Sequence, residues 1–235
     1  MSLDFEEVLE VNRLRLVARV VSNAAHDVNN ALQVIGGSAE MLAIRPTLGP
    51  TEQRRVQAIT SQTERIAATL DRLSSITRLD GRGRQSVDVT RLADDAVALR
   101  AFSLGRARIA VTVDHPVGLS CMVSADRRLI LQVFLNLLLN VEQVLADRAA
   151  SAVQIRFERS DQDCSILFVD NGPGLGMEAR AHLVDGAPRP ELGPGLSGVG
   201  LWLSARIAAQ HGGSLEVDET SETGTSLRVR LPASS

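Results

Sequence analysis

Apolar residues recur every three or four positions through the first 80 residues. The first series comprises Leu14, Val17, Val21, Ala24, Val28, Ala31, Ile35 and Leu42. The second comprises Val56, Ile59, Thr63, Ile66, Leu70 and Leu73. This spacing places each series on one face of a helix. Between the two series Pro46, Gly49 and Pro50 interrupt the pattern. Residues 1–80 are therefore predicted to form a hairpin of two long amphipathic helices.

A single helical hairpin leaves part of its apolar surface in contact with water. Two helices cannot cover both of their apolar faces, whereas a second copy of the hairpin can complete a four-helix bundle. The pattern thus favours a homodimer built through residues 1–80.

The periodicity changes after the Gly/Arg/Ser-rich segment 81–86, which is predicted to be a linker. Apolar and polar residues then alternate, as in half-buried strands, over residues 108–114, 152–160 and 226–231. Helical patterns lie between them, over about 90–102, 126–147 and 200–211. The expected fold class is α plus α/β. A dimerising helical hairpin is followed by a two-layer α/β sandwich over residues 87–235.

Composition narrows the class of protein. The chain has 235 residues, of which 44% are hydrophobic, and its formal charge is −3. That charge argues against a general nucleic-acid binder, because no basic excess exists to neutralise phosphates. No membrane span or signal peptide is expected, so a cytoplasmic location is predicted. Cys121 and Cys164 stand in strand-like runs without metal-ligand spacing, which predicts two buried, reduced thiols.

His26 lies on the first predicted helix, within a polar face. Its neighbours on that face are Ser22, Asn23, Asn29, Asn30 and Gln33, and Asp27 adjoins it in the chain. A neutral imidazole is a good nucleophile near physiological pH, and a nearby carboxylate can fix its tautomer and accept its proton. An exposed histidine is equally typical of ordinary helix surface. The choice between these interpretations depends on the rest of the chain.

Three glycine clusters follow residue 170. The first has the sequence DNGPGLG and comes directly after an apolar strand. Asp170 at the strand end could accept a hydrogen bond from an exocyclic amine, while Gly172 and Gly174 let the backbone approach a flat base. The second contains GVGLWLS, in which Gly198 and Gly200 would bring backbone N–H groups and a helix N-terminus to phosphates. The third, TGTSLRV, is a tight turn that enters the last strand.

Upstream, Asn136 and Asn140 are four residues apart and share one face of a predicted helix. An amide oxygen there could bind Mg²⁺ that phosphates hold. Each feature alone has an ordinary explanation, because glycines mark turns and asparagines are common on polar helix faces. Their order and spacing together point to a nucleotide site.

These motifs resemble the transmitter core of a bacterial two-component sensor histidine kinase. HDVNNAL is similar to the phospho-acceptor box of nitrogen-regulation-type sensor kinases, and NLLLNVEQ to the N box. DNGPGL, GVGLWLS and TGTSL resemble the three glycine boxes. The resemblance covers about residues 14–232. It implies a dimerisation and phosphotransfer hairpin, followed by an ATP-binding domain of the gyrase–histidine kinase–MutL type.

The resemblance also assigns roles to residues. His26 would accept the γ-phosphoryl group, Asp27 would act as its general base, and Asn30 would support dephosphorylation of the partner. Asn140 would hold Mg²⁺, with Asn136 supporting it. The implied contacts of ATP are Asn136, Asn140, Asp170, Gly172, Gly174, Gly198, Gly200, Leu201, Gly224 and Thr225. The implied partner is the receiver domain of a response regulator, and the signal would enter through a sensor domain or a separate chain.

Some positions depart from the family pattern. The lid expected over about 176–197 lacks a phenylalanine-bearing box and instead carries Pro188, Pro190 and Pro194. Gln143 replaces a residue that is often basic, and Trp202 stands where glycine is frequent. Two other functions therefore stay open beside the kinase. One is a histidine phosphotransferase or scaffold without ATP turnover, and the other is an ATPase that works by clamp closure.

Overall fold

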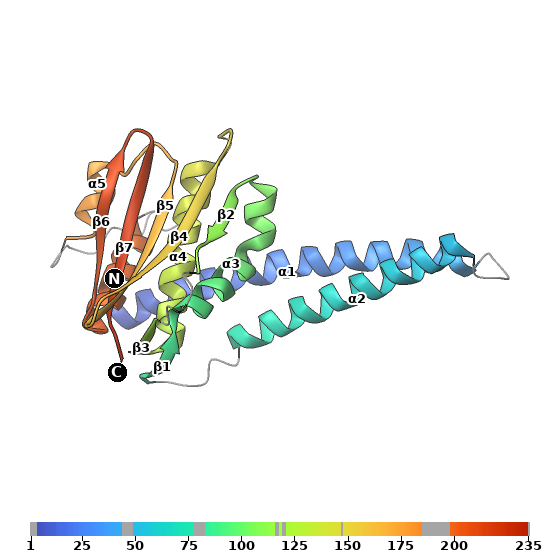
Figure 1. Cartoon of the computed structure of the whole chain (residues 1–235), viewed down its shortest axis with the longest axis horizontal. Coiled ribbons are helices and arrows are strands. Elements are labelled where there is room, and N and C mark those ends of the chain that lie inside the picture. The colour runs from blue at the N-terminus through green and yellow to red at the C-terminus, as the bar shows by residue number, and fades with distance from the viewer. Residues whose placement is uncertain are drawn as a thin grey trace. The chain divides into compact units, whose positions relative to one another are not determined.

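The computed structural model describes residues 4–43, 49–77, 83–115, 118, 121–146, 148–184 and 198–234. The chain divides into two compact units (Figure 1). One unit is the helical segment Val17–Asp80. The other combines the residues up to Leu16 with Gly81–Ser235 and contains the β-sheet.

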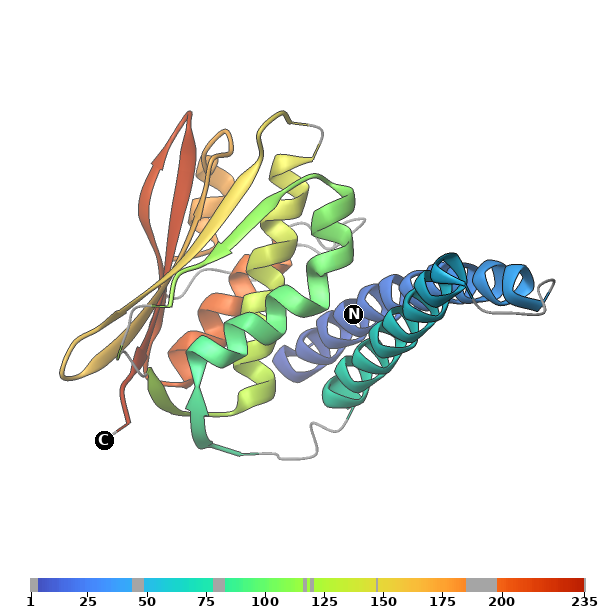
Figure 2. The ribbon, with the colours of Figure 1, turned by 45° about the vertical axis from the view of Figure 1, so that its right-hand side comes forward.

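The helical unit contains most of α1 (Phe5–Ala43) and all of α2 (Pro50–Thr77). Within this unit the two helices run alongside each other, as Figures 1 and 2 show. The predicted hairpin is therefore confirmed. Pro46, expected in the connecting loop, lies outside the described residues.

Large apolar side chains of this hairpin remain in contact with solvent. They are Val21, Leu32, Val34, Met41 and Val56, each 43–52% exposed. Val21 and Val56 belong to the two periodic series of the sequence, so a single chain leaves parts of both stripes uncovered. This exposure is what a hairpin that pairs with a second copy would show.

The sheet unit contains two sheets. Its remaining elements are β1 (Gln85–Asp88), α3 (Val89–Arg106), β2 (Ala110–Val113), β3 (Met122–Ala125), α4 (Arg127–Leu145), β4 (Ala152–Arg159), β5 (Asp163–Asp170), α5 (Met177–Ala181), α6 (Val199–Gln210), β6 (Ser214–Ser221) and β7 (Gly224–Pro232). The main sheet has the order β2-β4-β5-β7-β6, in which only β2 and β4 are parallel. β1 pairs antiparallel with β3. The predicted linker 81–86 is thus too long, because β1 begins at Gln85.

Helices α3, α4 and α6 lie on one face of the main sheet (Figure 2). Phe134 of α4 contacts Phe168 of β5, with 5.5 Å between ring centroids. Ile155, Ile166 and Val229 from three strands are fully buried. The two-layer α/β sandwich predicted from alternating strands and helices is therefore confirmed.

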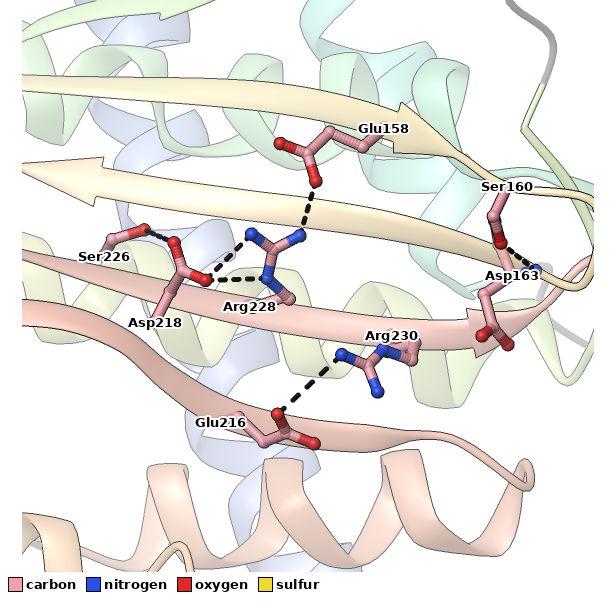
Figure 3. A network of polar contacts seen from close by, with 8 residues as sticks. All are labelled: Glu158, Ser160, Asp163, Glu216, Asp218, Ser226, Arg228 and Arg230. Atoms are coloured by element: carbon pink, nitrogen blue, oxygen red, sulfur yellow. Dashed lines mark hydrogen bonds and ion pairs between the residues drawn. The ribbon is translucent and has the colours of Figure 1, made fainter.

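The other face of the sheet carries charged side chains (Figure 3). Arg228 of β7 donates to Glu158 of β4 at 2.5 Å and to Asp218 of β6 at 2.9 Å. Its neighbours in the strand, Leu227 and Val229, point to the helices and are buried. This alternation matches a sheet with one packed face and one wet face.

Helix α4 forms the centre of the helical layer. Phe134, Leu137 and Leu138 are at most 1% exposed. Among the described residues it is the one helix whose length and mean hydropathy would suffice to cross a membrane. Since 67% of this stretch is buried within the protein, its hydropathy matches that of a core helix.

Cys121 and Cys164 are both fully buried and free. Burial and a hydrogen bond with Cys164 raise the pKa of Cys121 to about 12. Burial likewise raises the pKa of Cys164. The prediction of two buried thiols is confirmed, and both are held in the protonated, unreactive form at neutral pH.

A buried ion pair joins α3 to α4. Arg100 is 3% exposed, and its Nε donates to Glu142 Oε1 at 2.8 Å. The hydroxyl of Ser103 donates to the same oxygen at 3.1 Å. Removal of one partner would leave the other charge buried without compensation.

We expect Glu142→Ala to lower the free energy of unfolding by about 3–5 kcal/mol, because it leaves the guanidinium of Arg100 unpaired. The double variant Arg100→Met/Glu142→Leu should recover most of that loss. Urea denaturation measures both. Arg127→Ala is the control, since Arg127 pairs with Asp95 in an exposed contact worth at most about 1 kcal/mol. A Glu142→Ala variant as stable as wild type would contradict a structural role for the pair.

Candidate functional site

The candidate site is built along α4, whose first turn is firmly anchored. Asp126 caps the helix by accepting from the backbone N–H of Arg128 at 2.9 Å. Burial would raise the pKa of Asp126, but hydrogen bonds from Arg128 lower it overall. The backbone N–H of Asp126 donates to His211 Nε2 at 3.1 Å, which ties the start of α4 to the end of α6.

Asn136 and Asn140 lie one turn apart on α4 but differ in environment. Asn136 is buried, and its Nδ2 donates to the carbonyl of Gly200 and to Ser204 Oγ, both at 3.3 Å. It therefore fixes α4 against α6. Asn140 is only partly buried and lines a pocket between these helices. The residues that line this pocket are Arg15, Asn136, Leu139, Asn140, Gln143, Gly198, Gly200 and Leu201.

Glycines form the entry into α6 on the other side of the pocket. Gly198 has a φ of 77°, a left-handed conformation that favours glycine, and no side chain in the described part of the chain caps this helix. An added β-carbon at Gly198 would lie 2.8 Å from His182 Nε2. At Gly200 it would lie 3.6 Å from Asn136, an ordinary contact. The uncapped backbone N–H groups at this helix start are suited to an anion.

Asp170 is the last residue of β5 and is 8% exposed. Burial raises the pKa of this carboxyl, and hydrogen bonds from the backbone N–H groups of Gly172 and Thr225 partly offset that rise. Its Oδ1 accepts from Gly172 at 2.8 Å. A β-carbon on Gly172 would lie 2.9 Å from Val144, one turn beyond Asn140 on α4. The carboxylate therefore lies beside the same helix as the pocket.

The start of β7 completes this wall. Thr225 is buried and stands opposite Asp170 in the β5–β7 register. A β-carbon on Gly224 would lie 2.4 Å from the Asp170 carbonyl oxygen. Gly174 has a φ of 85°, and its β-carbon would lie 2.2 Å from the carbonyl oxygen of Ser221. Side chains are thus sterically excluded at both glycines, so the backbones of the two glycine clusters pack directly together.

The sheet unit therefore contains every residue that the sequence assigned to ATP. His26, Asp27 and Asn30 lie on α1 in the helical unit. The side chains of His26 and Asp27 are outside those that the structure describes, while Asn30 is exposed. Of the predicted lid, α5 is described, but residues 185–197 with their three prolines are not.

Asn12, Arg15 and Ser204 also lie in this region, and the sequence did not predict them. The first two belong to the sheet unit, although residues 1–80 were assigned to the hairpin. A signal was present, because Val8, Asn12 and Leu16 recur every four residues and are all at most 5% exposed. Ser204 is four residues after Gly200, and its hydroxyl donates to the Gly200 carbonyl at 2.7 Å.

Two family models match the chain. The first is described as a His Kinase A (phospho-acceptor) domain and matches residues 16–82. The second is described as a histidine kinase-, DNA gyrase B- and HSP90-like ATPase and matches residues 125–235. The first match contains His26, and the second contains every residue assigned to ATP.

Curated relatives match over nearly the whole chain. The C4-dicarboxylate transport sensor protein DctB of Rhizobium meliloti is 28% identical over 96% of this chain. The sensory histidine kinase/phosphatase NtrB of the same organism is 28% identical over 94% of it. The chain spans only 36% of the length of DctB and 59% of that of NtrB.

Solved structures share the fold. The catalytic domain of the histidine kinase ThkA covers 65% of this chain and 97% of its own, with a TM-score of 0.53 and 19% identity. The histidine kinase AdeS of Acinetobacter baumannii covers 89% of this chain and 98% of its own, with a TM-score of 0.51 and 17% identity. These structures show the shared fold, while the two family models and the curated relatives match the chain to the transmitter core of sensor histidine kinases.

The raised pKa of Asp170 gives a prediction about stability. The folded state holds the proton of this carboxyl more tightly than the unfolded state, so ionised Asp170 destabilises the fold as pH rises through that range. We expect Asp170→Asn to unfold at the same or a higher temperature than wild type at pH 7. Its ATP affinity should fall roughly 5- to 150-fold, since a buried polar contact worth about 1–3 kcal/mol is disrupted.

Thermal unfolding without ligand and titration with ATP test these two effects separately. Asp163→Asn is a matched control at the other end of β5, away from the glycine clusters. A variant that binds ATP as wild type does would remove Asp170 from the nucleotide site. A loss of both stability and affinity would indicate a structural carboxylate.

Proposed function

We propose that this chain is an ATP-dependent protein-histidine kinase. It phosphorylates His26 and passes the phosphoryl group to an aspartate of a response regulator. The observation that carries the proposal is the nearly buried Asp170 carboxylate at the end of β5. It lies beside α4, the helix that also brings Asn140 to the glycine-lined pocket. The match to the phospho-acceptor family model, which includes His26 on α1, supports the proposal.

Asp170 would select the base. Its carboxylate accepts hydrogen bonds and would receive one from the exocyclic amine of adenine. Gly172, Gly174 and Gly224 keep this wall free of side chains, so the ring can approach the backbone. Guanine would present a carbonyl to the carboxylate, and GTP should therefore bind poorly.

The phosphates would occupy the pocket beside Asn140. Backbone N–H groups at Gly198 and Gly200 would donate to phosphate oxygens at the start of α6. The amide oxygen of Asn140 fits Mg²⁺, which prefers oxygen ligands and is commonly held by one or two protein groups plus phosphates. No group of three or more His, Cys, Asp or Glu side chains in the described residues forms a metal centre of its own. The ion would neutralise charge on the transferred phosphoryl group.

His26 is the nucleophile in this mechanism. A bond forms between an imidazole nitrogen and the γ-phosphorus, the bond from that phosphorus to the β–γ bridging oxygen breaks, and ADP leaves. Asp27 takes up the imidazole proton. ATP and His26 belong to different units, so the reaction requires the two units to bring them together, with the segment before β1 as the hinge. The protein contributes mainly positioning.

A homodimer would complete the hairpin. The exposed apolar residues of α1 and α2 support pairing into a four-helix bundle. A receiver domain is the proposed partner. ThkA, one of the similar structures, was solved in complex with the response regulator protein TrrA, with a TM-score of 0.51. The signal would reach the core from a sensor domain or a separate chain, and we place the core in the cytoplasm.

We expect His26→Gln to abolish labelling of the protein by γ-labelled ATP with Mg²⁺, while ATP affinity stays within about twofold of wild type. The label on the wild-type protein should be lost in acid and kept in base, as for a phosphoramidate. His115→Gln is the control, because His115 lies in the sheet unit and pairs with Asp94.

The same assay separates the other two functions. A label that survives acid would move the modification to Ser or Thr and sink the assignment of His26. Neither label nor ADP would indicate a phosphotransferase or scaffold. Free phosphate without labelled protein would indicate a clamp-type ATPase.

Asn30, one turn after His26, gives a prediction about the reverse activity. Its amide is exposed and could orient a water molecule that attacks the phospho-aspartate of a docked regulator. Asn30→Ala should leave His26 labelling within a few-fold of wild type. It should slow dephosphorylation of the regulator about 10-fold, equivalent to about 1.4 kcal/mol. Timed decay of the pre-phosphorylated regulator measures this, with Gln33→Ala as an exposed control on the same face. Equal decay with wild type and Asn30→Ala would make Asn30 ordinary surface.

A further inference from the structure

The first three turns of α1 belong to the sheet unit, and we call residues 5–16 the docking segment. Val8 and Leu16 are 1% and 5% exposed. The ring of Phe5 meets the ring of Trp202 on α6 edge-on, with centroids 6.1 Å apart. The carbonyl of Leu9 accepts from Gln132 Nε2 on α4 at 3.3 Å. The segment is therefore packed against both helices that border the nucleotide pocket.

Asn12 aligns the docking segment with the pocket. It is 1% exposed, and its Nδ2 donates to Asn136 Oδ1 at 3.0 Å. Asn136 in turn donates to the carbonyl of Gly200. Two buried amides thus connect the docking segment, α4 and the start of α6. The hydrogen bond between Asn12 and Asn136 therefore also fixes the position of the next turn of α1.

Arg15 follows Asn12 by three residues and lines the pocket together with Asn140, Gly198 and Gly200. It carries the only positive charge among the described residues that line this pocket. Gln143, on the α4 wall of the same pocket, is uncharged. A di- or triphosphate brings several negative charges, and a guanidinium fork matches phosphate oxygens in shape and charge.

We propose that Arg15 is a polyphosphate-binding residue of the ATP site, and that the docking segment positions it there. The guanidinium supplies the charge that the α4 wall lacks at Gln143. This inference rests on the proposed function, because it assigns a further ligand to the same nucleotide. It predicts that the first turns of α1 discriminate nucleoside di- and triphosphates from the nucleoside.

Arg15→Gln tests the proposal through the affinities for ATP, ADP and adenosine, measured by competition with a fluorescent nucleotide. We expect binding of ATP and ADP to weaken about 10-fold or more, since charge-assisted contacts to phosphate are lost. Binding of adenosine should stay within about twofold. Arg15→Lys should retain part of the affinity. Arg13→Gln is the matched control, because Arg13 is exposed on the same helix and pairs with Glu10.

A second variant tests the role of the docking segment. Val8→Asp places a charge at a buried contact and should release the segment from α4 and α6. It should cause the same loss for ATP with adenosine unaffected, and the loss should not add to that of Arg15→Gln. Circular dichroism and thermal unfolding verify that the sheet unit remains folded. Additive losses would contradict positioning by the segment.

Unchanged ATP affinity in Arg15→Gln overturns the inference. Tighter binding also overturns it, since the guanidinium would then obstruct the site. Equal weakening of ATP and adenosine would show a general disturbance of the pocket. The variant Asp170→Asn distinguishes a wrong role for Arg15 from a wrong proposed function. If that variant loses affinity while Arg15→Gln does not, the ATP site stands and only the role of Arg15 is wrong.

Discussion

The contact between α4 and α6 is the constraint on which the rest of the sheet unit depends. Asn136 makes it by donating from one buried amide to Gly200 and Ser204. The apolar residues of α4 are buried against the sheet. Displacing this helix would therefore disrupt the packing of the hydrophobic core. Asn140, one turn later, is thereby held at the edge of the pocket. The same helix stabilises the fold and brings Asn140 to the pocket that we propose for the phosphates.

Asp170 shows the opposite relation between stability and function. Its burial raises the pKa of the carboxyl, so its ionised form costs free energy in the folded protein. Among the described residues, the backbone N–H groups of Gly172 and Thr225 partly offset this cost. An adenine amine would supply a further donor. In the proposed site such a carboxylate would select the base, since a partner without the matching donor would leave it unpaired.

The helical unit follows a different rule. Its pairing surface is spread over exposed apolar side chains such as Val21, Leu32 and Met41, so its association would depend on area rather than on one contact. α1 belongs to both units, with the boundary after Leu16. A helix shared in this way connects the docking segment to the part of α1 that contains His26.

The sequence by itself determined the hairpin, the two-layer sandwich and the motifs with Asn140, Asp170 and the glycines, because helical and strand periodicities and glycine turns are local signals. The strands β1, β3 and β6 were not predicted, and β1 and β3 span only four residues each. Only the tertiary structure decided that residues 5–16 belong with the sheet and that Arg15 lines the pocket. It also showed that Asn136 is buried and Asn140 is not. These facts depend on contacts between residues more than 100 positions apart, such as Asn12 and Asn136, which no local pattern encodes.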